Sequence, residues 1–250
     1  WDFFWLKVLF VLSFLDSLAS VLKVLISVSV IRFAWWNSAK GALSSKRKTS
    51  SANLLCLIAK TSFGLEEVLA DEIKAIGGQN IDLGNRAVFY EGDLKIIYKS
   101  NYFLRTALRV LKEIEFFRFK NVDQFYLKCK NIDWQQYLSI DQSFVIHSNV
   151  GNSKDFTNSM FTSLKAKDAI ADYFRNKLGK RPNVDTENPE IVIDIHVYGD
   201  SCTISLDSSG ESLHKRGYRI NQGDAPLNEV LAAGMIKLSG WTGNSDFLDP

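Results

Sequence analysis

The chain has 250 residues, 46% of them hydrophobic, with 30 Lys and Arg against 28 Asp and Glu and a formal net charge of +2. With 15 Gly, four Pro and three Cys, the composition excludes collagen-like, disordered and disulfide-rich chains. Residues 1–52 hold seven basic and two acidic residues, so residues 53–250 carry a balance of −3. A case for nucleic-acid binding therefore rests on local patches of charge.

Residues 3–36 are strongly apolar, but charged residues divide them into uncharged runs of eight, six and eight residues. A membrane span needs about 20 consecutive apolar residues. Three interpretations stay open: a marginal or interfacial anchor, a signal-like segment, and upstream sequence wrongly joined to the reading frame. The first residue is Trp1 rather than Met, and the composition changes abruptly at 44–51, which favours the third. We therefore expect residues 1–52 to be an extension and linker outside the fold.

The next part of the chain predicts a small layer of helices on a sheet. In chain order, the pattern predicts a strand at 53–60, a helix at 65–76, a strand at 86–91, a helix at 94–103 and a strand at 106–117. Gly77 is typical of a helix C-cap, and Asp93 of an N-cap. The apolar residues that mark the second helix are Leu94, Ile97, Tyr98 and Phe103.

A second unit begins near residue 120. It is expected to contain a helix at 122–130, a turn at 134–138, a strand at 143–148, a helix at 160–178 and a hairpin of strands at 191–198 and 202–206. The apolar stripe of the long helix is assigned to Leu164, Ala171, Phe174 and Leu178. Further on, Pro226 is placed in the first turn of a last helix. Residues 247–250 begin like a buried strand that is cut off, so the chain is expected to be truncated.

No catalytic constellation is complete. The three His residues share no metal-ligand spacing, and there is no phosphate-binding loop or nucleophile elbow. The carboxylate pairs Glu66-Glu67 and Asp71-Glu72 are interpreted as solvated groups on a helix surface. Cys56, Cys129 and Cys202 are interpreted as reduced packing residues of a cytoplasmic protein.

Two local clusters of basic residues stand out against the negative balance of 53–250. Such clusters suit a phosphate backbone, because Lys and Arg displace its condensed counterions. A Tyr between two Arg residues could stack on a base. The alternative is solvated surface charge. The candidate RNA-contacting residues are Lys165, Lys167, Arg175, Lys180, Arg181, Lys215, Arg216, Tyr218 and Arg219.

Residues 163–175, 181–185 and 204–207, followed by Ser209-Gly-Glu-Ser-Leu-His-Lys-Arg-Gly-Tyr-Arg219, resemble a THUMP domain. More narrowly, they are similar to the THUMP-containing RNA guanine-N2 methyltransferases that act on bacterial 23S ribosomal RNA. The run from Ser209 to Arg219 is the most specific part of the resemblance.

Two further stretches resemble other parts of the same family. Gly64-Leu-Glu-Glu67 is similar to its N-terminal ferredoxin-like part, and residues 225–233 and 247–250 are similar to the entry into its methyltransferase domain. The resemblance implies an α+β fold, truncated at the first strand of a Rossmann-like methyltransferase domain. The implied boundaries are a ferredoxin-like domain at 53–118, a THUMP RNA-binding domain at 119–219 and the start of the methyltransferase domain at 220–250.

The resemblance also implies S-adenosylmethionine as the cofactor. In this family a Cys-Gly-Ser-Gly loop approaches the cofactor, and an Asn-Pro-Pro-Tyr-type motif holds a flipped guanine. Neither motif lies within these 250 residues, so we expect the chain by itself to bind RNA and to be inactive. The residues implied to border the cofactor pocket are Asp249, Pro250, Pro226, Leu227 and Asn228.

The leading hypothesis is that residues 53–250 recognise RNA, above all 23S rRNA, for a cytoplasmic methyltransferase of rRNA processing that needs no metal. A second hypothesis is a THUMP module of another tRNA- or rRNA-modifying enzyme, such as a thiolation enzyme. A third is a membrane-anchored interaction protein built on residues 3–36. The segment at 225–250 favours the first over the second.

Overall fold

The computed structural model describes residues 54–217 and 227–248. The chain divides into residues 1–52 and 53–250, and the account below concerns the second part. Within the described residues, no helix is long and apolar enough to cross a membrane. The predictions that lie outside the described residues are those for residues 1–52, Tyr218, Arg219, Pro226, Asp249 and Pro250.

The first elements alternate strands and helices, as the sequence pattern predicts. They are β1 (Leu55–Lys60), α2 (Glu66–Ile76), β2 (Gln79–Leu83), β3 (Ala87–Gly92), α3 (Leu94–Phe103) and β4 (Arg109–Arg118). Gly77 ends α2 in the left-handed conformation, with φ 98°. The sequence pattern does not reveal β2, because its five residues include Gln, Asn and Asp and show no run of strand-forming side chains.

The next elements also follow the predicted order. They are α4 (Val122–Lys130), the 3-10 turn η2 (Trp134–Gln136), β5 (Ser143–Gly151), α5 (Ser159–Leu178), β6 (Asn183–Val184), β7 (Ile191–Tyr198) and β8 (Ser201–Asp207). The predicted hairpin is confirmed, since β7 and β8 pair antiparallel and Tyr198 faces Ser201 next to the turn. The two-residue strand β6 is too short to leave a periodic signal in the sequence.

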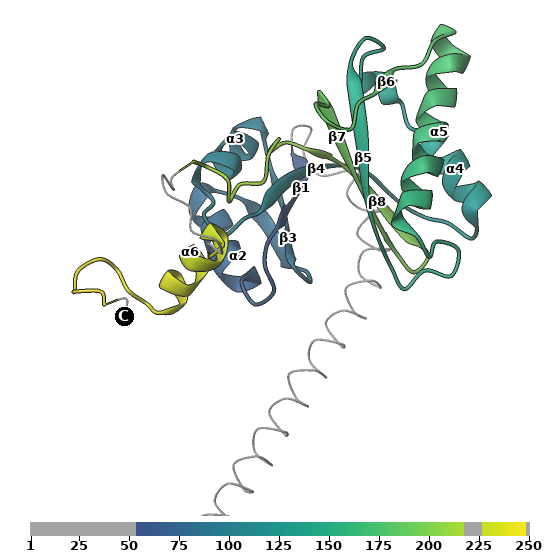
Figure 1. Ribbon diagram of the computed structural model, residues 1–250. Helices are drawn as coiled ribbons and strands as arrows, with labels where there is room; N and C mark the ends of the chain where they lie inside the picture. The colour runs from purple at the N-terminus through teal and green to yellow at the C-terminus, as the bar shows by residue number, and fades with distance from the viewer. Residues whose placement is uncertain (1–53, 218–226, 249–250) are drawn as a thin grey trace, which may run out of the picture. The chain divides into compact units, whose positions relative to one another are not determined.

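The eight strands found in the described residues form one sheet in the order β2-β3-β1-β4-β8-β7-β5-β6 (Figure 1). The central pair β4 and β8 is antiparallel and joins the first group of elements to the second. An ion pair of 2.7 Å between Lys60 Nζ on β1 and Asp194 Oδ2 on β7 crosses the same junction. Among the strands of the described ranges, the parallel pairs are β5 with β6 and β5 with β7. The mixed α+β architecture is therefore confirmed.

Two separate apolar cores lie against this sheet. The smaller includes Leu69 and Ile73 of α2 and Ile97 of α3, and the larger includes Phe125 of α4 and Phe174 of α5. Figure 1 shows α4 and α5 together beside the strands of the larger core. Each group of helices thus buries one apolar stripe against its own part of the sheet.

The predicted apolar stripe of α5 is half wrong. Ala171 and Phe174 are buried, but Leu164 and Leu178 are 46% and 45% exposed. The buried residues of the helix are Thr162, Ala166, Ala169, Ile170, Ala171, Tyr173 and Phe174. Most of them lie three or four positions apart, so they form one face of the helix, and Leu164 and Leu178 lie outside it.

Asp93 is the N-cap of α3, as predicted. Its Oδ1 accepts a hydrogen bond of 2.9 Å from the Ile96 amide, which also donates to the Asp93 carbonyl at 3.1 Å. Asp93→Ala is expected to lower the free energy of unfolding by about 1 kcal/mol, while Asp93→Asn keeps most of it. Urea denaturation followed by circular dichroism measures this difference, and equal midpoints for Ala and Asn would contradict it.

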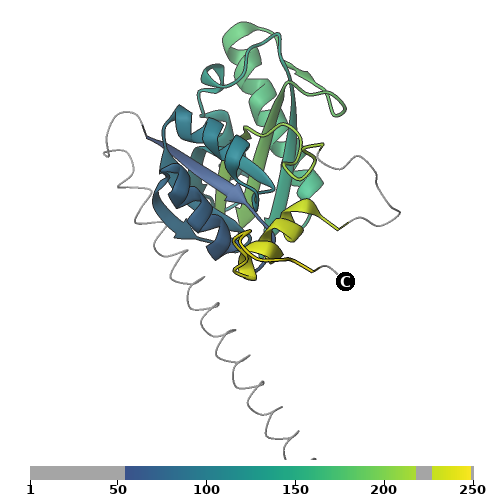
Figure 2. The ribbon, with the colours of Figure 1, turned by 90° about the vertical axis from the view of Figure 1, so that its left-hand side faces the viewer.

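The last described helix is α6 (Glu229–Leu238), and Asn228 is its N-cap. The helix thus begins later than the prediction that places Pro226 in its first turn. Figures 1 and 2 both show α6 beside the helices of the first group, and it contacts α2. Beyond it, residues 246–248 do not form the expected strand, and Leu248 is 88% exposed. A strand needs a neighbour for its backbone hydrogen bonds, and these residues have none in the described part of the chain.

Glu72 corrects the interpretation of the α2 carboxylates as solvated. It is 7% exposed, and its Oε2 accepts hydrogen bonds from the amides of Arg105 and Thr106 and, at 2.7 Å, from the Thr106 hydroxyl. Its Oε1 lies 2.7 Å from Lys237 Nζ of α6. Glu72 therefore holds three segments together.

Candidate nucleic-acid interface

A groove on α5 gathers part of the first predicted basic cluster. The groove has a volume of about 270 Å³. Its basic residues are Lys165, Lys167, Arg175 and Arg181, all of which were predicted as RNA contacts. We call this cavity the α5 groove. The residues that complete its lining are Tyr126, Phe144, Asp168, Ala171, Asp172, Pro182 and Val184.

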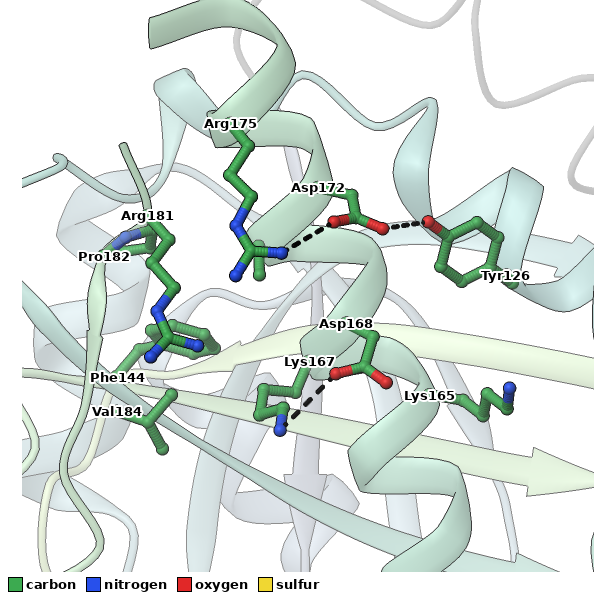
Figure 3. A pocket seen from close by; sticks show the side chains of 11 residues that line it. Tyr126, Phe144, Lys165, Lys167, Asp168, Asp172, Arg175, Arg181, Pro182 and Val184 are labelled. Atoms are coloured by element: carbon green, nitrogen blue, oxygen red, sulfur yellow. Dashed lines mark hydrogen bonds and ion pairs between the residues drawn. The ribbon is translucent and has the colours of Figure 1, made fainter. Parts of the chain in front are cut away.

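The spacing of residues along α5 explains which cations meet. Lys167, Ala171 and Arg175 are four residues apart and therefore lie in one row on the helix. Ala171, in the middle, has a side chain small enough to leave space between the two cations. Lys165 is only two residues from Lys167, so it faces another direction. Figure 3 shows Lys165 and Tyr126 on the side of α5 away from Lys167 and Arg175.

The second wall of the groove is the segment that follows α5. Gly179 ends the helix in the left-handed conformation, with φ 69°, and turns the chain back. Residues 183–184 then pair in parallel with the start of β5, which fixes the position of Arg181. Arg181 is exposed and forms no ion pair with any described residue. Figure 3 shows it on the same side of α5 as Lys167 and Arg175.

Two carboxylates lie among these cations and hold them in place. Asp172 Oδ1 is 3.3 Å from Arg175 Nη1, and Asp168 Oδ1 is 3.4 Å from Lys167 Nζ. The hydroxyl of Tyr126 donates to Asp172, which lowers the pKa of that carboxyl and raises the pKa of Tyr126 to about 12. Asp172 is therefore ionised at neutral pH, and Arg175 still directs part of its guanidinium outward, at 53% exposure.

Two other lysines of the same stretch do not line the groove. Lys177 instead lies 3.1 Å from Asp133 Oδ1 and donates to the Tyr173 hydroxyl at 2.8 Å. These contacts raise the pKa of Lys177 and lower that of Asp133 to about 2, in each case chiefly through hydrogen bonds to Tyr173. Lys180, a predicted RNA contact, is exposed just beyond the end of α5.

The second basic cluster divides differently. Arg216 donates from Nη1 to the carbonyl of Tyr102 at 2.6 Å, from Nη2 to that of Leu104 at 2.5 Å and from Nε to that of Leu213 at 2.9 Å. A cation at the last carbonyls of α3 is favourable for the helix dipole. Arg216 is thus a structural residue, with all three nitrogens engaged, whereas Lys215 is exposed.

Two of the residues predicted to border a cofactor pocket, Leu227 and Asn228, lie in the described part of the chain. Asn228 uses its side-chain oxygen as the cap of α6, accepting from the amides of Val230 at 2.9 Å and Leu231 at 3.4 Å. Leu227 is 49% exposed. Their place beside a cofactor stays a prediction.

Neither 54–217 nor 227–248 contains a group of three or more His, Cys, Asp or Glu arranged to hold a metal. None of the three cysteines forms a disulfide, and burial raises the pKa of the Cys129 and Cys202 thiols, which keeps them protonated.

Sequence reasoning missed the exposed aromatic residues of α3. Tyr98 and Tyr102 are each 74% exposed and Phe103 is 54% exposed, although the sequence pattern groups Tyr98 and Phe103 with Ile97 as apolar residues of the helix. The buried residues of this helix are Ile97 and Ser100, followed by Leu104. The spacing of these three residues was the available signal, since it places the two tyrosines on the other face.

Three protein-family models match the chain, and together they cover most of residues 56–250. Residues 56–111 match the RlmL ferredoxin-like domain, and residues 119–207 match the THUMP domain. Residues 216–250 match the RMKL-like methyltransferase domain. The α5 groove lies entirely within the residues that match the THUMP domain.

Several solved structures resemble the chain. A possible methylase from Clostridium difficile 630 is 32% identical, with a TM-score of 0.68 over 75% of this chain and 49% of that one. A predicted N6-adenine-specific DNA methylase from Listeria monocytogenes is 28% identical, with a TM-score of 0.67 over 75% and 49%. A candidate methyltransferase complexed with SAH is 27% identical, with a TM-score of 0.69 over 80% and 52%. The chain thus spans about half the length of these structures.

Proposed function

We propose that this chain, which belongs to the THUMP-containing methyltransferases by its ferredoxin-like, THUMP and methyltransferase segments, binds structured RNA for methyl transfer. The observation that carries the proposal is the α5 groove, where Lys167, Arg175 and Arg181 line one cavity of the THUMP domain. Converging cations in a chain segment of negative overall balance suit the phosphates of a nucleic-acid backbone.

The cations of the groove differ in how freely they can reach a phosphate. Arg181 has no ion-pair partner among the described residues, whereas Lys167 and Arg175 share their charge with Asp168 and Asp172. Arg181 and Arg175 can each present two N–H groups to one phosphate, because the guanidinium is a planar fork. We therefore assign the strongest phosphate contacts to these two arginines, with Lys167 as a point charge beside them.

For the whole protein, we propose an S-adenosylmethionine-dependent methyltransferase whose substrate is 23S rRNA and whose target atom is guanine N2. The match of residues 216–250 to a methyltransferase domain supports the reaction class. The similar structure complexed with SAH supports the cofactor. The guanine-N2 target and the rRNA substrate come from the resemblance of residues 204–219 to that enzyme group.

The RNA-binding part of the proposal is tested with the triple variant Lys167→Gln, Arg175→Gln and Arg181→Gln. Each lost phosphate contact is expected to reduce the slope of log K against log salt by about 0.7–1, so the triple variant loses about 2–3. Its affinity is expected to fall by at least about tenfold for 23S rRNA fragments at ~0.1 M salt. Fluorescence anisotropy titrations at several salt concentrations give both quantities.

The matched control is Lys154→Gln, which removes an exposed positive charge that does not line the groove. It is expected to change the salt slope by less than about 0.5, because it removes only long-range, screened attraction. An unchanged slope for the triple variant, or an equal loss for Lys154→Gln, would show that RNA is not bound in the α5 groove.

The methyl-transfer part is tested separately. The reading frame beyond Pro250 is expected to encode a Cys-Gly-Ser-Gly loop and then an Asn-Pro-Pro-Tyr motif. The corresponding protein should transfer a labelled methyl group from S-adenosylmethionine to 23S rRNA, with N2-methylguanine as the product after digestion. Labelled N6-methyladenine in DNA would instead support the reaction class that the Listeria structure is named for.

A further inference from the structure

The outer face of α3 carries aromatic rings that the core does not use. Tyr98 and Tyr102 lie one turn apart on this face, and each is 74% exposed. Phe103 is 54% exposed, and its ring meets that of Tyr102 edge to face, with 4.9 Å between the centroids. Phe103 therefore supports one side of Tyr102, while both tyrosine rings remain open to solvent.

Tertiary structure brings the second basic cluster to the end of this helix. After β8, Ser208 and Ser209 bond to the side chain of Asn101 at 3.0 and 2.9 Å, and Arg216 bonds to the carbonyl of Tyr102. Figure 1 shows this yellow-green segment running back beside α3. Because Arg216 is fixed on Tyr102, the exposed Lys215 next to it lies at the aromatic end of α3.

The charges of this face favour an anionic partner. The ten residues of α3 include Lys95 and Lys99 and no Asp or Glu. Lys95 is exposed, whereas Lys99 donates to the carbonyl of Ile76 at 3.2 Å and is held against α2. The carboxylate of Asp93, at the start of the helix, accepts a hydrogen bond from the Ile96 amide. A face of open aromatic rings with cations at both ends suits nucleobases and their phosphates.

We propose that Tyr98 and Tyr102 form a stacking surface for unpaired bases of the RNA, with Lys215 and Lys95 facing its phosphates. Positions four apart on a helix have Cβ atoms about 5–6 Å apart, so neighbouring nucleotides of one strand can each reach a ring. Only unpaired bases expose faces for this contact, whereas a duplex offers the protein mainly phosphates and 2′-hydroxyls. This inference rests on the proposed function and adds a second RNA contact, outside the THUMP domain.

The test compares single-stranded and duplex RNA on the full 250-residue chain. The probes are a labelled oligoadenylate of about 12 nucleotides, within the usual site size of single-strand binders, and a blunt RNA duplex of the same length. Tyr98→Ala and Tyr102→Ala are each expected to weaken single-strand binding about tenfold and to leave duplex binding unchanged. The matched controls Tyr98→Phe and Tyr102→Phe keep the ring and are expected to stay within about twofold of the unsubstituted chain.

Stacking also has a spectroscopic signature. A 2-aminopurine placed in the single strand is expected to lose fluorescence on binding to the unsubstituted chain and to keep it with the Tyr98→Ala, Tyr102→Ala double variant. Equal single-strand affinities for the Ala and Phe variants would overturn the stacking surface. So would a concentration-dependent dimer that the Ala variants abolish, because the face would then bind a second copy.

The failures of the two proposals are distinguishable. If the chain binds neither probe, the proposed function itself fails. If the α5 groove variant loses duplex and rRNA binding while the tyrosine variants bind both probes normally, only the stacking surface is rejected. A loss of oligoadenylate binding in the tyrosine variants alone supports the stacking surface independently of the groove.

Discussion

Phe125→Ala is expected to lower the free energy of unfolding by about 3–5 kcal/mol. Phe125 is fully buried on α4, and its ring lies 4.8 Å from that of Phe156 and 5.5 Å from that of Phe119. The ring of Phe117 also packs against it, with 6.0 Å between the centroids. Removing the Phe125 ring therefore leaves a cavity among three rings that cannot close it. Urea denaturation followed by near-ultraviolet circular dichroism measures the loss.

The effect reaches the α5 groove through the next residue. Tyr126 follows Phe125 on α4 and bonds to Asp172, so a loosened α4 is expected to weaken the contact that positions Arg175. Phe125→Leu retains most of the apolar volume and is expected to cost about 1–2 kcal/mol. Leu127→Ala removes a half-exposed side chain of the same helix and is expected to cost less than about 1 kcal/mol. A cost for Leu127→Ala equal to that of Phe125→Ala would contradict the burial described for α4.

Glu72→Ala is expected to lower the free energy of unfolding by about 3 kcal/mol, because it leaves the buried amide and hydroxyl of Thr106 without an acceptor. Glu72→Gln keeps an oxygen for Thr106 and is expected to cost about half as much. Lys237→Ala removes only an ion pair whose lysine is 45% exposed, and it is expected to cost less than about 1 kcal/mol.

The same series separates two roles of Glu72. If hydrogen exchange of the α6 amides rises in Lys237→Ala while that of α2 does not, the ion pair holds α6 and the Thr106 bonds hold the first group of elements. Asp71→Ala, at an exposed position of the same helix, is the control and is expected to stay within about 0.5 kcal/mol of the unsubstituted chain. A destabilisation by Asp71→Ala as large as that by Glu72→Ala would show that the helix surface, not the buried network, sets the stability.

The sequence by itself determined most of the local structure. Two helices end at Gly77 and Gly179, because glycine readily adopts the left-handed conformation that each C-cap has. One helix begins after Asp93, because its side chain accepts a hydrogen bond from an amide of the first turn. The alternation at 191–198 and 202–206 predicted the hairpin, since each strand buries one face. The resemblance of residues 163–219 also indicated the THUMP domain, and the family comparison confirmed it.

Only the tertiary structure decided what each charged or aromatic side chain does. Lys177 belongs to the same basic stretch as Lys167, but it forms an ion pair with Asp133. Arg216 is next to Lys215 in the sequence, but it donates to a carbonyl at the end of α3. A sequence records the charge of a side chain but not the partners that tertiary packing brings to it.

The same reason applies to the site as a whole. Glu72 was interpreted as solvated and is buried, because its partners Thr106 and Lys237 lie far from it in the sequence. Tyr98 was grouped with Ile97 in the apolar pattern of α3, yet Ile97 is buried and Tyr98 lies on the surface. The length, composition and motifs thus determined the class of protein and its elements, while the contacts between segments distant in the sequence selected the cations that line the α5 groove.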